Sequence, residues 1–228
     1  MPSRDATGPQ APAGVDALRR RPDDPGDSGA IDEVVERILD ATLEAATVHG
    51  VRRTSMSDVA RRAGMSRPTL YKRFSSKDEL VRAVVARETS RITAAILEAA
   101  TGTDDPTEAL DAAVLVALRE VREHPLLDRV IRTEPETLVP MIVADPSPVM
   151  VVGREAAQSI IARRAPRLSE LDVRRLADVL IRLLVSYALT PPDDPPEVVA
   201  SSVAGLLASR FADADEVPHH ATHPGEEP

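Results

Sequence analysis

The sequence predicts an all-α protein of nine or ten helices, and three observations carry this prediction. Apolar residues recur at intervals of three and four along most of residues 30–214, which is the spacing of an amphipathic helix. No stretch of useful length alternates apolar with polar residues, as a half-buried strand would. Glycine and proline separate one periodic stretch from the next, as breakers between helices do.

The composition excludes several classes of protein. The 228 residues contain no cysteine, which rules out disulfides, cysteine-ligated zinc and thiol nucleophiles. No run of roughly 18 uncharged apolar residues is present, so no membrane span is expected. The first 27 residues lack the apolar core of a secretory signal, and we therefore expect a cytoplasmic protein.

We expect a disordered tail at each end, over residues 1–29 and 215–228. The first tail holds five prolines and four glycines without apolar periodicity, so it can bury too little apolar surface to offset the entropy of ordering. Its three consecutive arginines, at residues 19–21, are either an arm that contacts DNA phosphates or a solvated run. The second tail contains three histidines that could bind a metal ion opportunistically: His219, His220 and His223.

Between the tails, periodicity and stop signals place the helices. The first covers residues 31–49 and ends at Gly50. Further helices are predicted from residue 77 toward Gly102, from Pro106 to about His124, and over about residues 148–165, 168–190 and 196–213. The proline-rich residues 135–148 are either a mobile lid or a pair of loops.

Residues 50–77 form a basic island in an acidic chain. The whole chain has a net charge of −9, but this segment has eight basic residues and one acid, so the other 200 residues carry −16. Basic side chains displace counterions from phosphates, so such an island is typical of a nucleic-acid binder. The basic residues are Arg52, Arg53, Arg61, Arg62, Arg67, Lys72, Arg73 and Lys77.

The island also predicts two short helices joined by a tight turn. Ser55 caps the first helix, with Asp58 in a capping-box position, and Gly64 ends it because glycine adopts the left-handed conformation without steric cost. Ser66 caps the second, and Pro68 lies in its first turn, where a missing N–H is harmless. This pattern favours a helix-turn-helix, whose second helix enters the major groove, over a basic hairpin that only solvates its charges. The inward-facing residues are predicted to be Val59, Ala60, Ala63, Leu70 and Phe74.

Residues 54–80 resemble the tetracycline-repressor (TetR) family of bacterial one-component regulators. The most specific features are the Ala63-Gly64 turn, the run Thr69-Leu70-Tyr71, Phe74 and Lys77, taken together. The resemblance covers about 50 residues, from the helix at residues 31–49 to the start of the helix at residue 77. Pro68 stands where many members have glycine, a departure that could alter base choice.

The resemblance implies a set of DNA contacts. Arg67 would reach base edges, where a bidentate pair with guanine contributes about 1–3 kcal/mol of discrimination. Pro68 and Thr69 would lie against bases, sugar or a thymine methyl group, and Tyr71 would place its hydroxyl on a phosphate or base. The remaining residues would contact phosphates, which position the protein without specifying sequence: Ser55, Ser57, Lys72, Arg73 and Lys77.

The last two predicted helices carry the residues expected at a dimer interface. Residues 168–190 are apolar on more than one face, and residues 196–213 combine apolar with small residues that allow close approach. An ordinary monomer core explains this pattern too; the resemblance implies instead a four-helix bundle between two chains, and a twofold dimer that reads a palindrome. The interface residues are then Val173, Leu176, Leu180, Leu183, Tyr187, Val199, Val203 and Leu206.

The resemblance also makes residues 107–165 or so an effector-sensing region. Candidate polar residues of an effector site are His124, Arg132, Arg154, Gln158 and Tyr187, although each is explained more simply as part of a surface ion pair or as a satisfied core group. Trp and Phe are absent between residues 75 and 210, which disfavours an aromatic cage. Aliphatic walls favour a hydrophobic or amphipathic small molecule.

The sequence therefore predicts a homodimeric, ligand-responsive DNA-binding regulator, most simply a repressor, with no cofactor and no metal ion. The DNA-binding domain would cover residues 30–76 and the effector and dimerisation domain residues 77–214. A helical-bundle enzyme is disfavoured because His49 and His124 lack metal-ligand spacing and the carboxylates are scattered. A protein-interaction adaptor without a DNA role is disfavoured by the basic island. Activation in place of repression stays open.

Overall fold

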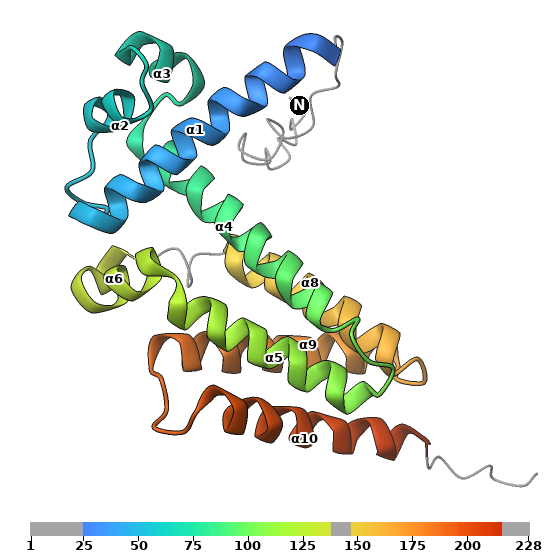
Figure 1. Cartoon of the computed structure of the whole chain (residues 1–228). Helices are drawn as coiled ribbons and strands as arrows, with labels where there is room; N and C mark the ends of the chain where they lie inside the picture. The colour runs from blue at the N-terminus through green and yellow to red at the C-terminus, as the bar shows by residue number, and fades with distance from the viewer. Residues whose placement is uncertain (1–24, 138–146, 216–228) are drawn as a thin grey trace, which may run out of the picture. The chain divides into compact units, whose positions relative to one another are not determined.

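The computed structural model describes residues 25–137 and 147–215, which form helices joined by turns and bends (Figure 1). The all-α prediction is therefore confirmed. The helices are α1 (Pro25–His49), α2 (Met56–Arg62), α3 (Arg67–Arg73), α4 (Lys77–Ala99), α5 (Pro106–Glu123), α6 (Pro125–Thr133), α8 (Pro148–Arg164), α9 (Glu170–Leu189) and α10 (Pro196–Asp215). The chain divides into a unit of residues 1–37 and a unit of residues 38–228, and the contacts described below lie within the second.

Most predicted helix ends agree with the structure, but the boundary of the first tail is wrong. α1 begins at Pro25, inside the predicted tail of residues 1–29, because a proline with its fixed φ is well suited to a first helical turn. α10 likewise continues to Asp215. The remainder of both tails, with the arginines at residues 19–21 and the three tail histidines, lies outside the described residues, as do residues 138–146.

Serine side chains begin α2, α3 and α4. The hydroxyl oxygens of Ser55, Ser66 and Ser76 each accept a hydrogen bond from the backbone N–H three residues later, at 3.1–3.3 Å. Each bond satisfies an N–H group that has no partner within its helix. The capping box predicted at Ser55 is only half formed, because the Asp58 carboxylate binds Arg61 and Arg62 instead of turning back to the cap.

Gly64 makes the tight turn between α2 and α3. Its φ is +66°, its N–H bonds to the carbonyl of Arg61 at 3.2 Å, and the next N–H, of Met65, bonds to the carbonyl of Ala60 at 2.9 Å. This pair of bonds is the Schellman motif that ends many helices. Among the described residues no heavy atom lies within 4 Å of the place where a Cβ would stand, so the left-handed backbone alone selects glycine here.

Helices α1 to α4 contribute buried apolar side chains. Ile38 of α1, Val59 of α2 and Leu70 of α3 are fully buried, and Leu80 of α4 is 1% exposed. The residues predicted to face inward are all buried: Val59, Ala60, Ala63, Leu70 and Phe74. Each of these four helices therefore contributes at least one side chain that is almost or fully buried.

Helices α5, α8, α9 and α10 share a second core. Leu110, Val114 and Leu118 of α5 are buried together with Ala157 and Ile161 of α8 and with apolar residues of α9 and α10. α10 packs chiefly on α5, α9 packs chiefly on α8, and α4 packs on both α5 and α8. Figure 1 shows α5 running between α4 and α10, so α5 connects the long helix α4 to the last helix of the chain.

This core corrects the predicted dimer interface. Four of the eight residues assigned to it are buried inside the chain: Val173, Leu180, Val199 and Val203. The assignment is wrong for these four, because a side chain covered by α5 and α8 of its own chain has no surface left for a partner. Leu176, Leu183 and Tyr187 are half-buried, whereas Leu206 is 72% exposed.

Candidate nucleic-acid interface

The recognition helix α3 is anchored on one face and open on the others. Leu70 is fully buried and Phe74 is 7% exposed, so these two side chains fix the orientation of a seven-residue helix. Tyr71 is 51% exposed, which leaves most of an aromatic side chain available for contact. The exposed residues of α3 are those predicted to meet DNA: Arg67, Pro68, Thr69, Tyr71, Lys72 and Arg73.

The hydroxyl of Thr69 takes part in the cap of α3. It lies 2.8 Å from the hydroxyl of Ser66, which also accepts the Thr69 N–H. Since the cap engages the oxygen, the methyl group is the part of Thr69 left for an apolar contact with a base.

The other predicted phosphate contacts lie before and after α3 in the chain. Ser55 is exposed at the cap of α2, and Ser57 is half-buried in the first turn of that helix. Lys77 begins α4, and its Nζ donates a hydrogen bond to the backbone oxygen of Arg52 at 2.8 Å. Lys77 therefore also fixes the loop between α1 and α2.

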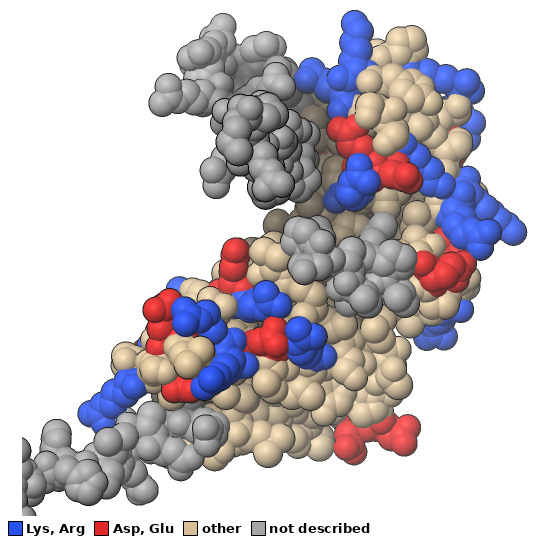
Figure 2. Space-filling model, turned by 180° about the vertical axis from the view of Figure 1, so that it is seen from behind, with Lys and Arg blue, Asp and Glu red and all other residues tan. Residues whose placement is uncertain are grey.

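Several arginines of the basic island bind carboxylates. Arg62 lies 2.6 Å from Glu44 and also reaches Asp58, which pairs with Arg61 as well. Arg52 pairs with Glu136 at 3.0 Å. These pairs neutralise much of the charge beside α3, whereas α3 has no acid in its first turn and two basic residues in its last. Figure 2 shows Lys and Arg side chains projecting from the part of the chain that carries α2 and α3.

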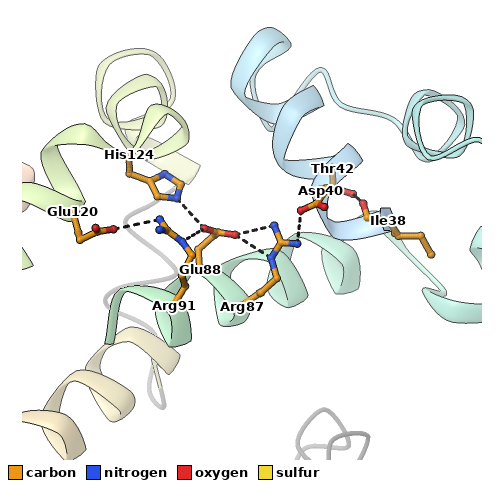
Figure 3. A network of polar contacts seen from close by, with 8 residues as sticks. All are labelled: Ile38, Asp40, Thr42, Arg87, Glu88, Arg91, Glu120 and His124. Carbon is orange, nitrogen blue, oxygen red and sulfur yellow. Dashed lines mark hydrogen bonds and ion pairs between the residues drawn. The ribbon is translucent and has the colours of Figure 1, made fainter. Parts of the chain in front are cut away.

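A buried carboxylate, Glu88, connects α4 to two other helices (Figure 3). Its side chain accepts hydrogen bonds from Arg87 at 2.8 and 3.0 Å and from Arg91 at 3.1 Å, and it lies 3.3 Å from Nε2 of His124. Arg87 also binds Asp40 of α1 at 2.7 Å. The network therefore runs from α1 through α4 to the junction of α5 and α6.

His124 is held in one tautomer by this arrangement. Its Nδ1 accepts the backbone N–H of Leu127 at 3.3 Å, which caps α6. An accepting Nδ1 carries no proton, so the ring proton is on Nε2 and is donated to Glu88. Burial alone would raise the pKa of Glu88, but the hydrogen bonds from Arg87, His124 and Arg91 outweigh burial and hold the pKa below its ordinary value.

A second buried carboxylate, Glu134, binds the loop between α1 and α2. Glu134 follows α6 and is 8% exposed, and it accepts the backbone N–H of Arg52 at 3.1 Å. Gly50 has a φ of +89°, and a Cβ at this position would lie 2.0 Å from Oε1 of Glu134. The backbone therefore favours glycine at residue 50, and any larger residue would also displace the Glu134 carboxylate.

Comparison with known families and relatives agrees with this geometry. The sequence profile described as "Bacterial regulatory proteins, tetR family" matches residues 38–84, and that of the "Bacterial Tetracyclin repressor, C-terminal domain" matches residues 105–209. An uncharacterized HTH-type transcriptional regulator of Mycobacterium tuberculosis is 30% identical over 198 residues, which are 84% of this chain and 92% of the relative. The chain belongs to the TetR family. It is a DNA-binding helix-turn-helix transcriptional regulator.

Two further proteins resemble this TetR regulator over most of its length. The HTH-type transcriptional activator FasR of Mycolicibacterium smegmatis is 28% identical over 191 residues, 82% of this chain and 85% of FasR. The crystal structure of the TetR family repressor AlkX from Dietzia sp. superposes with a TM-score of 0.65 at 24% identity and covers 78% of this chain and 97% of AlkX. The latter similarity establishes the fold.

Family membership decides between the functions that the sequence left open. TetR-family proteins are regulators that bind operator DNA and small-molecule effectors, so the chain is not an enzyme, and an adaptor without a DNA role is excluded. Within the described residues, no group of three or more acidic or histidine side chains could hold a metal ion. No helix in that part of the chain is long and apolar enough to cross a membrane.

Three of the five residues predicted to line an effector site bind other side chains of the chain. His124 is buried and bonded to Glu88 and Leu127, Arg132 pairs with Asp128 at 2.6 Å, and Arg154 pairs with Asp178 at 3.0 Å. Gln158 is half-buried in α8, and Tyr187 packs against the second core. For His124, Arg132 and Arg154 the simpler explanations, a satisfied core group and surface ion pairs, describe the structure.

Sequence reasoning missed Glu88 and Glu134. A signal for Glu88 was present, because it continues the series Leu80 and Val84 at intervals of four and therefore occupies an inward-facing position. Glu134 gave no such signal, since it lies outside any periodic stretch and its hydrogen-bond partner, the Arg52 N–H, lies 82 residues earlier.

Glu88→Gln should lower the free energy of unfolding by about 1–3 kcal/mol at pH 7, because it removes a buried carboxylate that accepts charged hydrogen bonds. Folding lowers the pKa of Glu88 from 4.5. The ionised carboxylate therefore stabilises the folded protein above about pH 4.5, and this contribution is lost as the pH falls through the lowered pKa. Urea unfolding of both proteins between pH 3 and 7 should show the difference shrinking toward low pH.

The matched control for this experiment is Asp128→Asn, which removes an exposed ion pair with Arg132 and should cost no more than about 1 kcal/mol. A Glu88→Gln protein as stable as the wild type at pH 7, or a difference that grows on acidification, would contradict the role assigned to the Glu88 network.

Proposed function

We propose that this TetR regulator is a homodimeric repressor that binds a palindromic operator and is released from it by an apolar or amphipathic small molecule. The observation that carries the proposal is α3, a short helix anchored by Leu70 and Phe74 whose other faces present arginine, lysine and tyrosine side chains. We place the protein in the cytoplasm, where its operator would be.

The proposed DNA contacts divide into two kinds. Arg67, Pro68 and Thr69, at the start of α3, would meet base edges, and Tyr71 a base or phosphate. Ser55, Ser57, Lys72, Arg73 and Lys77 would contact phosphates. Base contacts specify sequence, whereas phosphate contacts add affinity and salt dependence.

The proposed dimer uses the surface of α9 and α10 that faces away from the core. α10 exposes Val198 and Leu206 at 49% and 72%, and α9 exposes Val179 at 50%. Gly205, beside Leu206, has no described atom within 4 Å of its would-be Cβ, which leaves room for close approach of a second chain. Two copies related by a twofold axis would present their α3 helices to half-sites about one DNA turn (~34–36 Å) apart.

The proposed release depends on α6, which is bonded at both ends. At its start, the capping residue His124 contacts Glu88 of α4, and after its end Glu134 binds the Arg52 N–H in the loop before α2. A shift of α6 would therefore act on α4 and on the loop before the helix-turn-helix together. An effector produces such a shift only if it binds the two states with different affinities.

We favour repression because it requires only occupancy of the operator, whereas activation also requires a contact with the transcription machinery. AlkX is named a repressor and implicated in the biodegradation of n-alkanes, which supports an apolar effector here, while FasR is named an activator. A promoter fusion carrying the operator distinguishes the two signs: expression should rise when the regulator is deleted.

The proposal is tested first by selecting DNA from a random duplex pool with the purified protein at near-physiological salt and without effector. We expect a palindrome with half-sites about one turn apart. Weak, salt-sensitive binding without a motif would contradict an effector-free repressor.

Arg67→Ala and Lys72→Ala should have different effects on operator binding. Loss of Arg67 should cost about 1–3 kcal/mol and relax preference at one base position of each half-site. Loss of Lys72 should weaken binding to all sequences alike and reduce the slope of log K against log[salt] by about 1 per subunit. Titrations of operator and scrambled duplexes at several salt concentrations measure both; equal losses on every duplex would sink the assignment of Arg67.

Leu206→Asp should produce a folded monomer with greatly reduced operator affinity, because it places a charge on an exposed position of the proposed interface. Leu207→Asp is the matched control: Leu207 is 6% exposed and lies in the core, so the same substitution there should unfold the chain. Sedimentation and circular dichroism separate these results. A Leu206→Asp protein that stays dimeric would place the interface elsewhere.

A further inference from the structure

Arg122, in the last turn of α5, differs from the neighbouring arginines of the effector domain. Five of these bind carboxylates: Arg119, Arg132, Arg154, Arg174 and Arg182. In contrast, Nε and Nη2 of Arg122 are buried and have no hydrogen-bond partner among the described residues. Buried donors are almost always bonded, so an unpartnered pair on one side chain indicates a missing acceptor.

The two atoms form one edge of the guanidinium group. The N–H bonds of Nε and Nη2 point side by side in the plane of the group, which is the fork that binds both oxygens of a carboxylate. The unsatisfied part of Arg122 is therefore one complete bidentate edge. A water molecule can satisfy such an edge only in part, whereas a planar oxyanion matches it with two parallel bonds.

Arg122 is half-buried, and buried apolar residues lie near it in the chain. It lies four residues after Leu118 and four before Leu126, which are 3% and 8% exposed, and Leu118 belongs to the second core. Arg129, in α6, repeats the pattern: its Nε is also buried without a partner among the described residues, and it lies between Leu126 and Val130, both buried.

The Glu197 carboxylate does not bind the buried edge of Arg122. The carboxylate of Glu197, at the start of α10, accepts a hydrogen bond from Arg119, which together with a weaker attraction from Arg122 lowers the pKa of Glu197. The charge of Arg122 therefore attracts the Glu197 carboxylate without a hydrogen bond between them. Because a guanidinium group stays protonated in proteins, Arg122 cannot relieve its burial by losing its charge.

We propose that the buried edge of Arg122 binds the carboxylate head group of the effector, with Arg129 as a second donor. The inference rests on the proposed function, since it names the chemistry of the ligand that would release the regulator from DNA. The effector would then be an amphiphile with an anionic polar end, and not a neutral hydrocarbon or an alcohol. Without the ligand the edge has no partner among the described residues, so the proposal also predicts that Arg122 destabilises the ligand-free protein.

The test compares decanoate with decan-1-ol, which share a tail and differ in the head group. Binding of each to the full-length protein is measured by titration calorimetry for the wild type, Arg122→Met, Arg122→Lys and Arg119→Met. Arg119→Met is the matched control, because Arg119 lies one turn away on the same helix and is 50% exposed. The melting temperatures of the ligand-free proteins are recorded in parallel.

We expect decanoate to bind the wild type and the Arg119→Met control alike. Its Kd should rise at least about tenfold in Arg122→Met, the equivalent of about 1.4 kcal/mol, and less in Arg122→Lys, which keeps the charge but loses the fork. Decan-1-ol should bind the wild type more weakly than decanoate, and its Kd should change less than about twofold in Arg122→Met. The ligand-free Arg122→Met protein should melt at a higher temperature than the wild type, because an unpartnered buried charge is gone.

Three results would overturn the inference: decanoate binding that is absent from the wild type, decanoate binding that is unchanged in Arg122→Met, or a ligand-free Arg122→Met protein that melts below the wild type. The last would mean that water or protein already satisfies the edge. The proposed function survives any of these three results if the wild-type protein selects a palindromic operator and an alcohol or alkane releases the protein from that operator. Failure of operator selection would instead count against the proposed function itself.

Discussion

The Glu88 carboxylate is the centre of a polar network that joins α4 to α1 and to the start of α6. It is buried on α4, and it is stable there as an anion because Arg87, Arg91 and His124 donate hydrogen bonds to it. Arg87 extends the network to Asp40 of α1, and His124 extends it to the cap of α6. A buried charge of this kind loses its compensation if one donor moves. The network therefore favours one relative placement of α1, α4 and α6, and a ligand that favoured another would have to offset the loss of these bonds.

The charges of the DNA-binding part serve two different purposes. Arg52, Arg61 and Arg62 bind carboxylates and stabilise the loop and helix that precede α3, so they contribute less to the attraction of DNA than a count of basic residues suggests. The residues of α3 itself remain exposed because Leu70 and Phe74 occupy its only buried face. The acidic remainder of the chain disfavours DNA binding elsewhere on the surface.

The effector domain shows how packing assigns similar residues to different roles. On α10, Val203 and Leu207 are buried against α5, whereas Val198 and Leu206 of the same helix face away from the core. On α5, Arg119 binds Glu197 at the surface, whereas the bidentate edge of Arg122 is buried three residues later. On α10, the buried and exposed residues differ because a turn of 3.6 residues places them on different faces. Arg119 and Arg122 lie about one turn apart on α5 and differ in how far they are covered.

Much of this protein was determined by local sequence. The helix-turn-helix followed from Ser55, Gly64, Ser66 and the spacing of Leu70 and Phe74, because caps, turns and anchors act within a few residues and only glycine suits the left-handed turn. Most of the longer helices followed from periodicity for the same reason, although the start of α1 at Pro25 and the short helix α6 did not. Tertiary structure alone decided which apolar faces of α9 and α10 are core, because two apolar faces on one helix look alike in sequence until their partners α5 and α8 are known. It also decided the contact of Glu88 with His124, the contact of Glu134 with the Arg52 N–H, and the burial of the Arg122 edge. The groups involved in the two contacts lie 36 and 82 residues apart in the chain, a separation that no local pattern encodes.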